Sequence, residues 1–212
     1  MSLLKKILKK TPFYSLRLNA IKKNKLKKAI GEWVANGKEI PPPQFIKHEV
    51  IKSFAALRNI KILIETGTYL GETLEACKPH FNKLISIELD QNLYQVAVKK
   101  FANDTQIHIY HGDSGKIIEK IIKDIKQPCL FWLDGHYSEG ITAKGDLNTP
   151  VINELKHILT HHIKNHVILI DDARCFIGEN DYPTIPHLLN FVKQFNQNLK
   201  LLVEDDIIRI YS

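Results

Sequence analysis

The chain has few cysteines and no long apolar run, and both absences narrow its class. Cys77, Cys129 and Cys175 are odd in number, far apart and outside any Cys-x-x-Cys pair, which argues against a disulfide framework and a thiolate zinc site. No apolar run approaches the roughly 18 residues that a membrane span requires. The start at Met1 also lacks the apolar stretch and cleavage site of a secretory signal. We therefore expect a cytoplasmic protein in a reducing compartment.

Negative charge is almost missing from the first 38 residues. Lysine and arginine are opposed there only by Glu32, which gives this segment a net charge of +10, whereas the whole chain of 212 residues carries +7. The rest of the chain is therefore mildly acidic. Because the positive charge is confined to the start, any contact with an anionic membrane surface or a polyanion would belong to that segment. Peripheral membrane contact is one expectation, and a solvated charged helix is the alternative.

Prolines and a glycine mark a boundary near residue 40. Apolar residues recur at helical spacing through residues 3–33, with lysines between them. Residues 37–43, Gly-Lys-Glu-Ile-Pro-Pro-Pro, would end such a helix. We predict a basic helical extension over residues 1–40 and one α/β domain over residues 41–212.

From residue 61 onward, short β-rich runs alternate with helical patterns, which is typical of parallel strands joined by crossover helices. Asp90, Ser114 and Thr149 are the predicted N-caps of three of these helices. The predicted strands are Lys61–Glu65, Lys83–Glu88, Ile107–His111, Leu130–Leu133 and Val167–Ile170, followed by a hairpin of Leu199–Val203 and Ile207–Ile210.

The turn after the first predicted strand has the composition of a nucleotide-binding loop. Gly67, Thr68 and Gly71 allow a tight turn and close backbone approach at a helix N-terminus. The third glycine of the dinucleotide fingerprint is missing, and Glu65 and Glu72 would repel a pyrophosphate. A cofactor with a cationic end fits better. S-adenosylmethionine, which carries an ammonium and a sulfonium and no phosphate, meets that requirement.

Acidic residues also close the next two predicted strands. Glu88 lies about 20 residues beyond the glycine turn, where an acidic side chain can bind the hydroxyls of an adenosine ribose. Asp113 and Ser114 follow the third strand, where they could meet the adenine edge. Taken singly, Glu88 and Asp113 could equally be helix caps or solvated acids. Their order and spacing together favour a cofactor site.

This pattern resembles the class I S-adenosylmethionine-dependent methyltransferases over roughly Lys61 to Ser212. The matching features are the acid-x-Gly-x-x-x-Gly turn, the acid closing the second strand, the Gly-Asp-Ser after the third and the terminal hairpin. The resemblance implies a Rossmann-like, mostly parallel seven-stranded sheet whose last strand runs antiparallel in a C-terminal hairpin.

Three more carboxylates follow the fourth and fifth predicted strands. Asp134, Asp171 and Asp172 should face one crevice, where they would repel one another unless a cation lies among them, and hard oxygen ligands suit Mg²⁺. Such an ion could bind and acidify a substrate hydroxyl. The alternative is that Asp171 and Asp172 only cap the following segment, with Asp134 bonded to nearby backbone.

The sequence Asp134-Gly-His136 together with the later Asp-Asp is similar to that of metal-dependent macrocin-type sugar O-methyltransferases. This resemblance implies that Asp134, Asp171 and Asp172 hold the metal, that Asp134 also lies at the cofactor, and that Asp134 or His136 takes the proton of the acceptor hydroxyl. The expected acceptor is a hydroxylated small molecule or a sugar or glycan.

Other classes remain as alternatives. One is a cofactor-binding or membrane- or polyanion-tethered module without metal-dependent turnover. No nucleic acid acceptor is expected, because the Asn/Asp-Pro-Pro-aromatic motif of base methylation is missing after the fourth strand. The loop 137–149 is either a cover for substrate or a plain connection. His157, His161 and His162 are interpreted as solvated surface residues, and a homo-oligomer is compatible with the sequence.

Overall fold

The computed structural model describes residues 12–135 and 149–212. The contacts divide the chain into two units, Met1–Ile46 and Lys47–Ser212, and each is described by itself. The predicted domain boundary near residue 40 stays a prediction.

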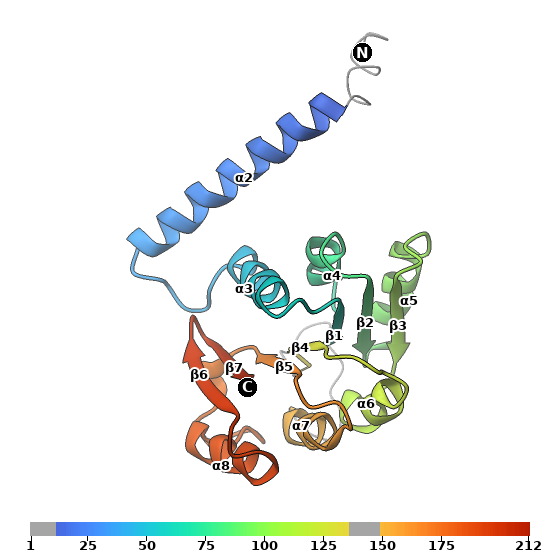
Figure 1. Ribbon diagram of the computed structural model, residues 1–212, viewed down its shortest axis with the longest axis vertical. Helices are drawn as coiled ribbons and strands as arrows, with labels where there is room; N and C mark the ends of the chain where they lie inside the picture. The colour runs from blue at the N-terminus through green and yellow to red at the C-terminus, as the bar shows by residue number, and fades with distance from the viewer. Residues whose placement is uncertain (1–11, 136–148) are drawn as a thin grey trace. The chain divides into compact units, whose positions relative to one another are not determined.

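The first unit contains helix α2, Pro12–Ala35 (Figure 1), as the basic helical pattern predicts. The helix ends at a turn in which Gly37 has a φ of 83°, and the indole N–H of Trp33 donates to the carbonyl of Glu39 at 3.1 Å. The lysines of its second half, among them Lys25 and Lys28, are exposed. Within the described ranges, no helix is both long and apolar enough to cross a bilayer.

The second unit is built on one seven-stranded sheet with the order β3-β2-β1-β4-β5-β7-β6. β1 to β5 pair in parallel, and β7 runs antiparallel to both of its neighbours. The predicted sheet, including the antiparallel terminal hairpin, is therefore confirmed. The strands are β1 Ile62–Thr66, β2 Lys83–Glu88, β3 Ile107–His111, β4 Leu130–Leu133, β5 Val167–Ile170, β6 Lys200–Glu204 and β7 Ile207–Tyr211.

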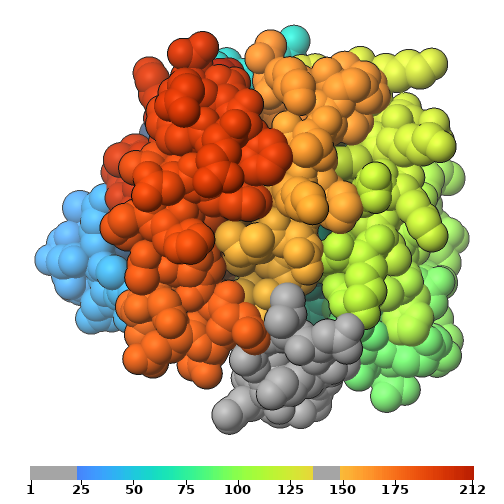
Figure 2. All heavy atoms as spheres, turned by 90° about the horizontal axis from the view of Figure 1, so that it is seen from below, coloured from blue at the N-terminus to red at the C-terminus, as the bar shows by residue number. Residues whose placement is uncertain are grey.

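Helices cover both faces of this sheet, so every side chain of its central strands β1, β4 and β5 is buried, as expected for parallel strands. In β1, for example, Ile62 and Ile64 pack on one face and Leu63 on the other. One face is covered by α6 Ser114–Ile122, α7 Val151–Thr160 and α8 Ile185–Phe195, which lie side by side in Figure 2. The other is covered by α3 Gln44–Leu57, α4 Glu72–Cys77 and α5 Gln91–Lys100 (Figure 1).

Strand order reverses between β1 and β4, which is where ligands bind in open α/β sheets. Beyond β1 the backbone continues to pair on both sides. The N–H of Gly67 donates to the carbonyl of Ile87 at 2.9 Å, and the N–H of Asp134 donates to the carbonyl of Thr66 at 3.1 Å. The carboxyl ends of β1, β2 and β4 are thus held in register at one edge.

Two predicted helix starts are wrong by one residue. Asp113, and not Ser114, is the N-cap of α6, because its carboxylate accepts from the N–H of Gly115. The N-cap of α7 is Pro150, although the hydroxyl of Thr149 accepts weakly from the N–H of Val151 at 3.4 Å. The predicted N-cap at Asp90 is confirmed.

Candidate functional site

The glycine turn after β1 is shaped by contacts within the protein. Gly67 has a φ of +85°, and a Cβ at this position would lie 2.5 Å from the carbonyl oxygen of Asp134. Gly71 has a φ of +69°, and its Cβ would lie 2.6 Å from the ring of Phe101. Both positions therefore require glycine. The turn thus lies close to the residue after β4 and to the end of α5, and its expected close approach to a ligand stays a prediction.

Buried side chains next to this turn are linked by a series of hydrogen bonds. The hydroxyls of Thr68 and Ser86 are 2.6 Å apart, and Ser86 donates to Oε2 of Glu65 at 2.6 Å. Glu65 is 1% exposed, and burial raises its pKa to about 8. Glu65 is therefore mostly neutral at pH 7. This weakens the argument that Glu65 repels a pyrophosphate, and the predicted cofactor contacts of Glu65 and Thr68 stay predictions.

The carboxylate of Glu88 is held in one orientation by backbone hydrogen bonds. Glu88 closes β2, is 6% exposed, and accepts backbone hydrogen bonds on both oxygens. Tyr69 N–H donates to Oε2 at 2.8 Å and Asp90 N–H donates to Oε1 at 2.9 Å. Since each carboxylate oxygen has two lone pairs, each can still accept from a hydroxyl. The carboxylate is thus fixed beside the glycine turn, as binding of two ribose hydroxyls requires.

Asp113 and Ser114 lie at the start of α6, next to the ends of β1 and β4. Asp113 caps the helix and lies 3.5 Å from the ammonium of Lys116, so the helix-cap interpretation holds for it. Ser114 is buried, and a Cβ on Gly135 would lie 3.4 Å from its hydroxyl and 3.1 Å from that of Thr66. Three element ends meet here, and the predicted adenine contact stays a prediction.

Glu154 on α7 was missed by the sequence reasoning. It is 1% exposed, its Oε1 has no hydrogen-bond partner, and it lines a small cavity together with Asp134, Thr149 and Tyr182. Burial raises the pKa of Glu154 to about 7, and burial also raises the pKa of Tyr182. Only the helical period of α7, which turns position 154 toward Val151 and Leu155, could have indicated this burial.

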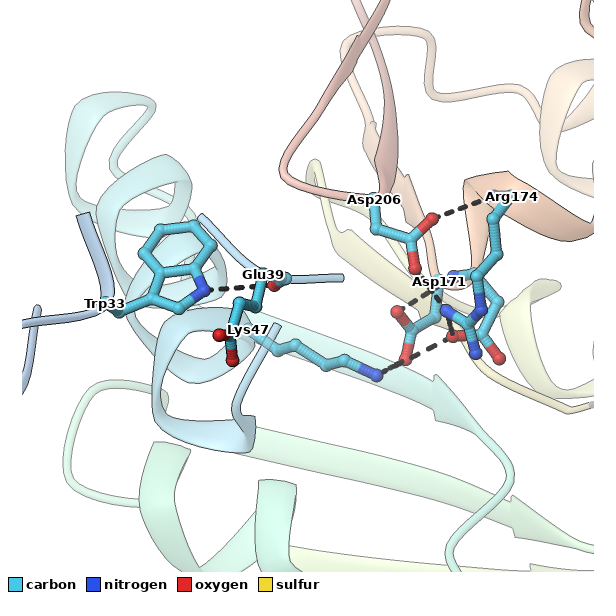
Figure 3. Close-up of polar contacts among 7 residues, drawn as sticks. Trp33, Glu39, Lys47, Asp171, Arg174 and Asp206 are labelled. Carbon is cyan, nitrogen blue, oxygen red and sulfur yellow. Dashed lines mark hydrogen bonds and ion pairs between the residues drawn. The ribbon is translucent and has the colours of Figure 1, made fainter. Parts of the chain in front are cut away.

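The three predicted metal carboxylates do lie at neighbouring strand ends, but a lysine lies among them. Asp171 and Asp172 are buried after β5, and Asp134 follows β4. The ammonium of Lys47, from α3, is hydrogen-bonded to Oδ2 of Asp171 and lies 3.8 Å from Oδ1 of Asp172 (Figure 3). Burial is the largest single effect and lowers the pKa of Lys47, but the charge and hydrogen bond of Asp171, with the charges of Asp134 and Asp172, together offset it and leave the pKa raised. The ammonium is therefore charged.

An arginine pairs with the other side of the cluster. Nη1 of Arg174 donates to Oδ1 of Asp172 at 2.7 Å and also to Oδ2 of Asp206 (Figure 3). Asp172 sits before the short helix η1, Ala173–Cys175, and makes no side-chain cap hydrogen bond. Asp172 is therefore the N-cap residue of η1 by position, while its carboxylate pairs with Arg174.

The described residues do not match a divalent-metal site. Residues 12–135 and 149–212 contain no group of three or more His, Cys, Asp or Glu side chains arranged to hold an ion. Burial first, and then the charges of Asp134 and Asp172, raise the pKa of Asp171. His136 lies outside the described residues.

His161, at the other end of the sheet, is buried and not a surface residue as we had interpreted it. His161 is 7% and His166 5% exposed, and Nδ1 of His161 lies 2.9 Å from Nε2 of His166. His166 also accepts from the N–H of Cys129 at 3.0 Å, and burial lowers its pKa to about 4. His161 is therefore part of a buried neutral pair, whereas His162 is exposed as predicted.

Comparison with known proteins identifies the fold. No protein-family model matches the chain, and no curated protein matches it. The O-methyltransferase TomG of Streptomyces achromogenes, solved with S-adenosylmethionine, has 14% identity over 87% of each chain and a TM-score of 0.54. The methyltransferase PaMTH1 of Podospora anserina, bound to S-adenosylhomocysteine, has 15% identity, 95% coverage of this chain and 97% of its own, and a TM-score of 0.54.

A third match, the N-methyltransferase NodS of Bradyrhizobium japonicum WM9, has 11% identity, 78% coverage of this chain and 85% of its own, and a TM-score of 0.52. These identities are low, so the likeness shows the fold alone. The second unit has the Rossmann-like methyltransferase fold. Since both O- and N-methyltransferases share it, the fold leaves the methyl-accepting atom open.

Proposed function

We propose that the chain is an S-adenosylmethionine-dependent methyltransferase that acts on a hydroxyl group. The observation that carries this proposal is Glu88, a buried carboxylate held by two backbone N–H groups at the carboxyl end of β2. It stands beside the turn of Gly67 and Gly71, at the point where the strand order reverses. In this arrangement Glu88 binds the two ribose hydroxyls of an adenosine.

The acceptor would approach from the cavity beside Asp134. When bound, S-adenosylmethionine supplies a methyl group on a cationic sulfur. A hydroxyl that attacks it must lose a proton, and we assign the role of accepting that proton to Asp134, which lines the cavity. Tyr182 and Glu154 both line the cavity. Because burial raises the pKa of both groups, at pH 7 Tyr182 is protonated and Glu154 is about half protonated. Both can then donate a hydrogen bond to the acceptor. Alignment of the acceptor with the methyl group would account for much of the rate.

A sugar or glycan hydroxyl is the acceptor class to screen first. The proposal rests on the similarity of Asp134, Asp171 and Asp172 to the macrocin-type pattern. The divalent metal predicted with that pattern does not fit the described residues, because Lys47 and Arg174 already pair with two of the three acids. We therefore assign no step to a metal.

Titration calorimetry with S-adenosylmethionine and, separately, with NAD⁺ tests the proposal. We expect binding of S-adenosylmethionine and none of NAD⁺. Glu88→Ala should weaken binding by about 100-fold or more, since it removes two hydrogen bonds to a charged acceptor, each worth roughly 1.5–3 kcal/mol. Glu119→Ala, an exposed acid on α6, serves as the control. Tight binding of NAD⁺, or binding of neither compound, would refute the proposal.

Partners and location are further parts of the proposal. We propose peripheral contact of the basic segment with anionic membranes, which the exposed lysines of α2, Lys23, Lys25, Lys27 and Lys28, support. Vesicle co-sedimentation at low and high salt tests it, and equal binding at both salts would contradict it. The cytoplasmic location and a homo-oligomer are likewise proposals.

A further inference from the structure

The strongest unexplained feature of the site is a buried positive charge at the carboxylate cluster. The side chain of Lys47 is 8% exposed, that of Asp171 1% and that of Asp172 7%. The ion pair of Lys47 with Asp171 joins residues 124 positions apart. A lysine is almost never buried to this degree unless it is paired, so this contact is a specific part of the fold.

Lys47 occupies the place where a divalent ion would bind. Its ammonium is hydrogen-bonded to Oδ2 of Asp171 (Figure 3), and a magnesium ion on that oxygen would lie roughly 2.1 Å away. The ammonium and the ion would then contact the same carboxylate oxygen. Two like charges on one oxygen in a buried site repel strongly, so either Lys47 or the metal must leave.

Other oxygens of the cluster also accept from protein donors. Oδ1 of Asp171 accepts from the N–H of Asp172 at 2.9 Å, and Oδ1 of Asp172 accepts from Arg174 at 2.7 Å. The second partner of Arg174, Asp206, is buried on the β6–β7 turn and anchors the arginine. Two cations of the chain therefore neutralise charge that a metal would otherwise balance.

We propose that Lys47 is the built-in counter-ion of the Asp134, Asp171 and Asp172 cluster and that the cluster functions without a divalent metal. Lys47 is a positioning residue, because it acts through Asp171 and Asp172 and not on a reacting atom. It keeps these two carboxylates together beside Asp134, which lines the cavity. This inference deepens the proposed function by stating how its site is charged. Its test uses no S-adenosylmethionine, so either can fail alone.

Titration of the full chain with Mn²⁺, followed by calorimetry and by the electron paramagnetic resonance of free Mn²⁺, tests the proposal. The variants are Lys47→Met, which keeps the length and removes the charge, and Lys47→Arg, which keeps the charge. Lys52→Met is the matched control, because Lys52 lies on the same helix and pairs only with Glu49 at 2.9 Å among the described contacts. Thermal unfolding with and without Mn²⁺ gives a second measurement.

We expect no saturable Mn²⁺ binding to the wild type, Lys47→Arg or Lys52→Met below about millimolar concentration. Lys47→Met should unfold at a lower temperature and should regain part of the loss when Mn²⁺ is added, because the vacated position then accepts the ion. A merely structural role for Lys47 would lower stability without this gain. Saturable binding to the wild type that Lys47→Met leaves unchanged or weakens would overturn the proposal. So would a Lys47→Met protein that is as stable as the wild type. If Lys47→Met does not fold, the wild-type and Lys47→Arg titrations decide.

Discussion

Glu154 offers a quantitative test of how burial acts in this molecule. Its carboxyl group is 1% exposed, and Oε1 has no hydrogen-bond partner. Burial raises its pKa from 4.5 to about 7, and the nearby charge of Asp113 adds to the rise, while the hydroxyls of Ser114 and Thr66 act in the opposite direction. The folded protein therefore keeps a proton on Glu154 that the unfolded chain has already lost.

The sign of the pH dependence follows from this difference. Well below pH 4.5 both the folded and the unfolded state hold the proton, so the ionisation of Glu154 does not change the free energy of unfolding. As the pH rises toward 7, only the folded state keeps it, so stability falls and then levels off. One unit of pKa corresponds to about 1.4 kcal/mol. The rise of the pKa from 4.5 to about 7 therefore lowers the free energy of unfolding at pH 8 by about 3 kcal/mol relative to acidic pH.

The substitution Glu154→Gln removes the ionisation and nearly preserves the shape. Urea unfolding at pH 4.5 and pH 8 should show that the variant gains about 3 kcal/mol relative to the wild type between the two pH values. Any fixed cost of the new amide cancels in this comparison. Glu119→Gln, at a side chain that is 71% exposed, should show no such gain. A pH-dependent gain below about 1 kcal/mol for Glu154→Gln would mean that folded Glu154 ionises normally, and the burial argument would be wrong.

Three further substitutions test the fold around the site. Gly67→Ala should destabilise more than Gly37→Ala in urea unfolding, because both glycines have a φ near +84°, but only Gly67 also has the Asp134 carbonyl within 2.5 Å of a Cβ; equal losses would contradict this. The folded His166 ring resists protonation to about pH 4, so the wild type should lose up to about 3 kcal/mol of stability between pH 6.5 and pH 4. His166→Asn should reduce this loss, and an unchanged dependence of stability on pH in this range would refute the prediction. Thr184→Ala should cost about 1 kcal/mol through the lost N-cap of α8, measured by thermal unfolding, and no change would contradict that cap.

Most of the secondary structure could be predicted from local pattern. β2, β3, β4 and β5 begin and end at the predicted residues, and Asp90 caps α5 as its position predicts. Such features depend on neighbours within a few residues, so they can be recognised in a short stretch of sequence. The two shifted helix starts show the limit, because adjacent cap candidates, such as Asp113 and Ser114, compete over a single residue.

The candidate site was only partly predictable for a related reason. Strand ends indicated where Glu88, Asp134 and Asp171 would gather, because the carboxyl ends of parallel strands share an edge of the sheet. The repulsion among the acids correctly indicated that a cation was needed. Its identity was predicted to be a metal, whereas the structure places Lys47 there.

The local order of residues therefore determined the strands, their sequence along the chain and the edge at which the acids meet. Only the tertiary structure decided which partner each acid would have. Lys47 and Asp171 are 124 residues apart, and nothing in the residues around either one indicates the other. The burial of Glu154 and His161 was decided in the same way, because a polar side chain on a helix becomes buried only when its neighbours pack over it. Charge pairing and burial act across space, and their result depends on the closed fold.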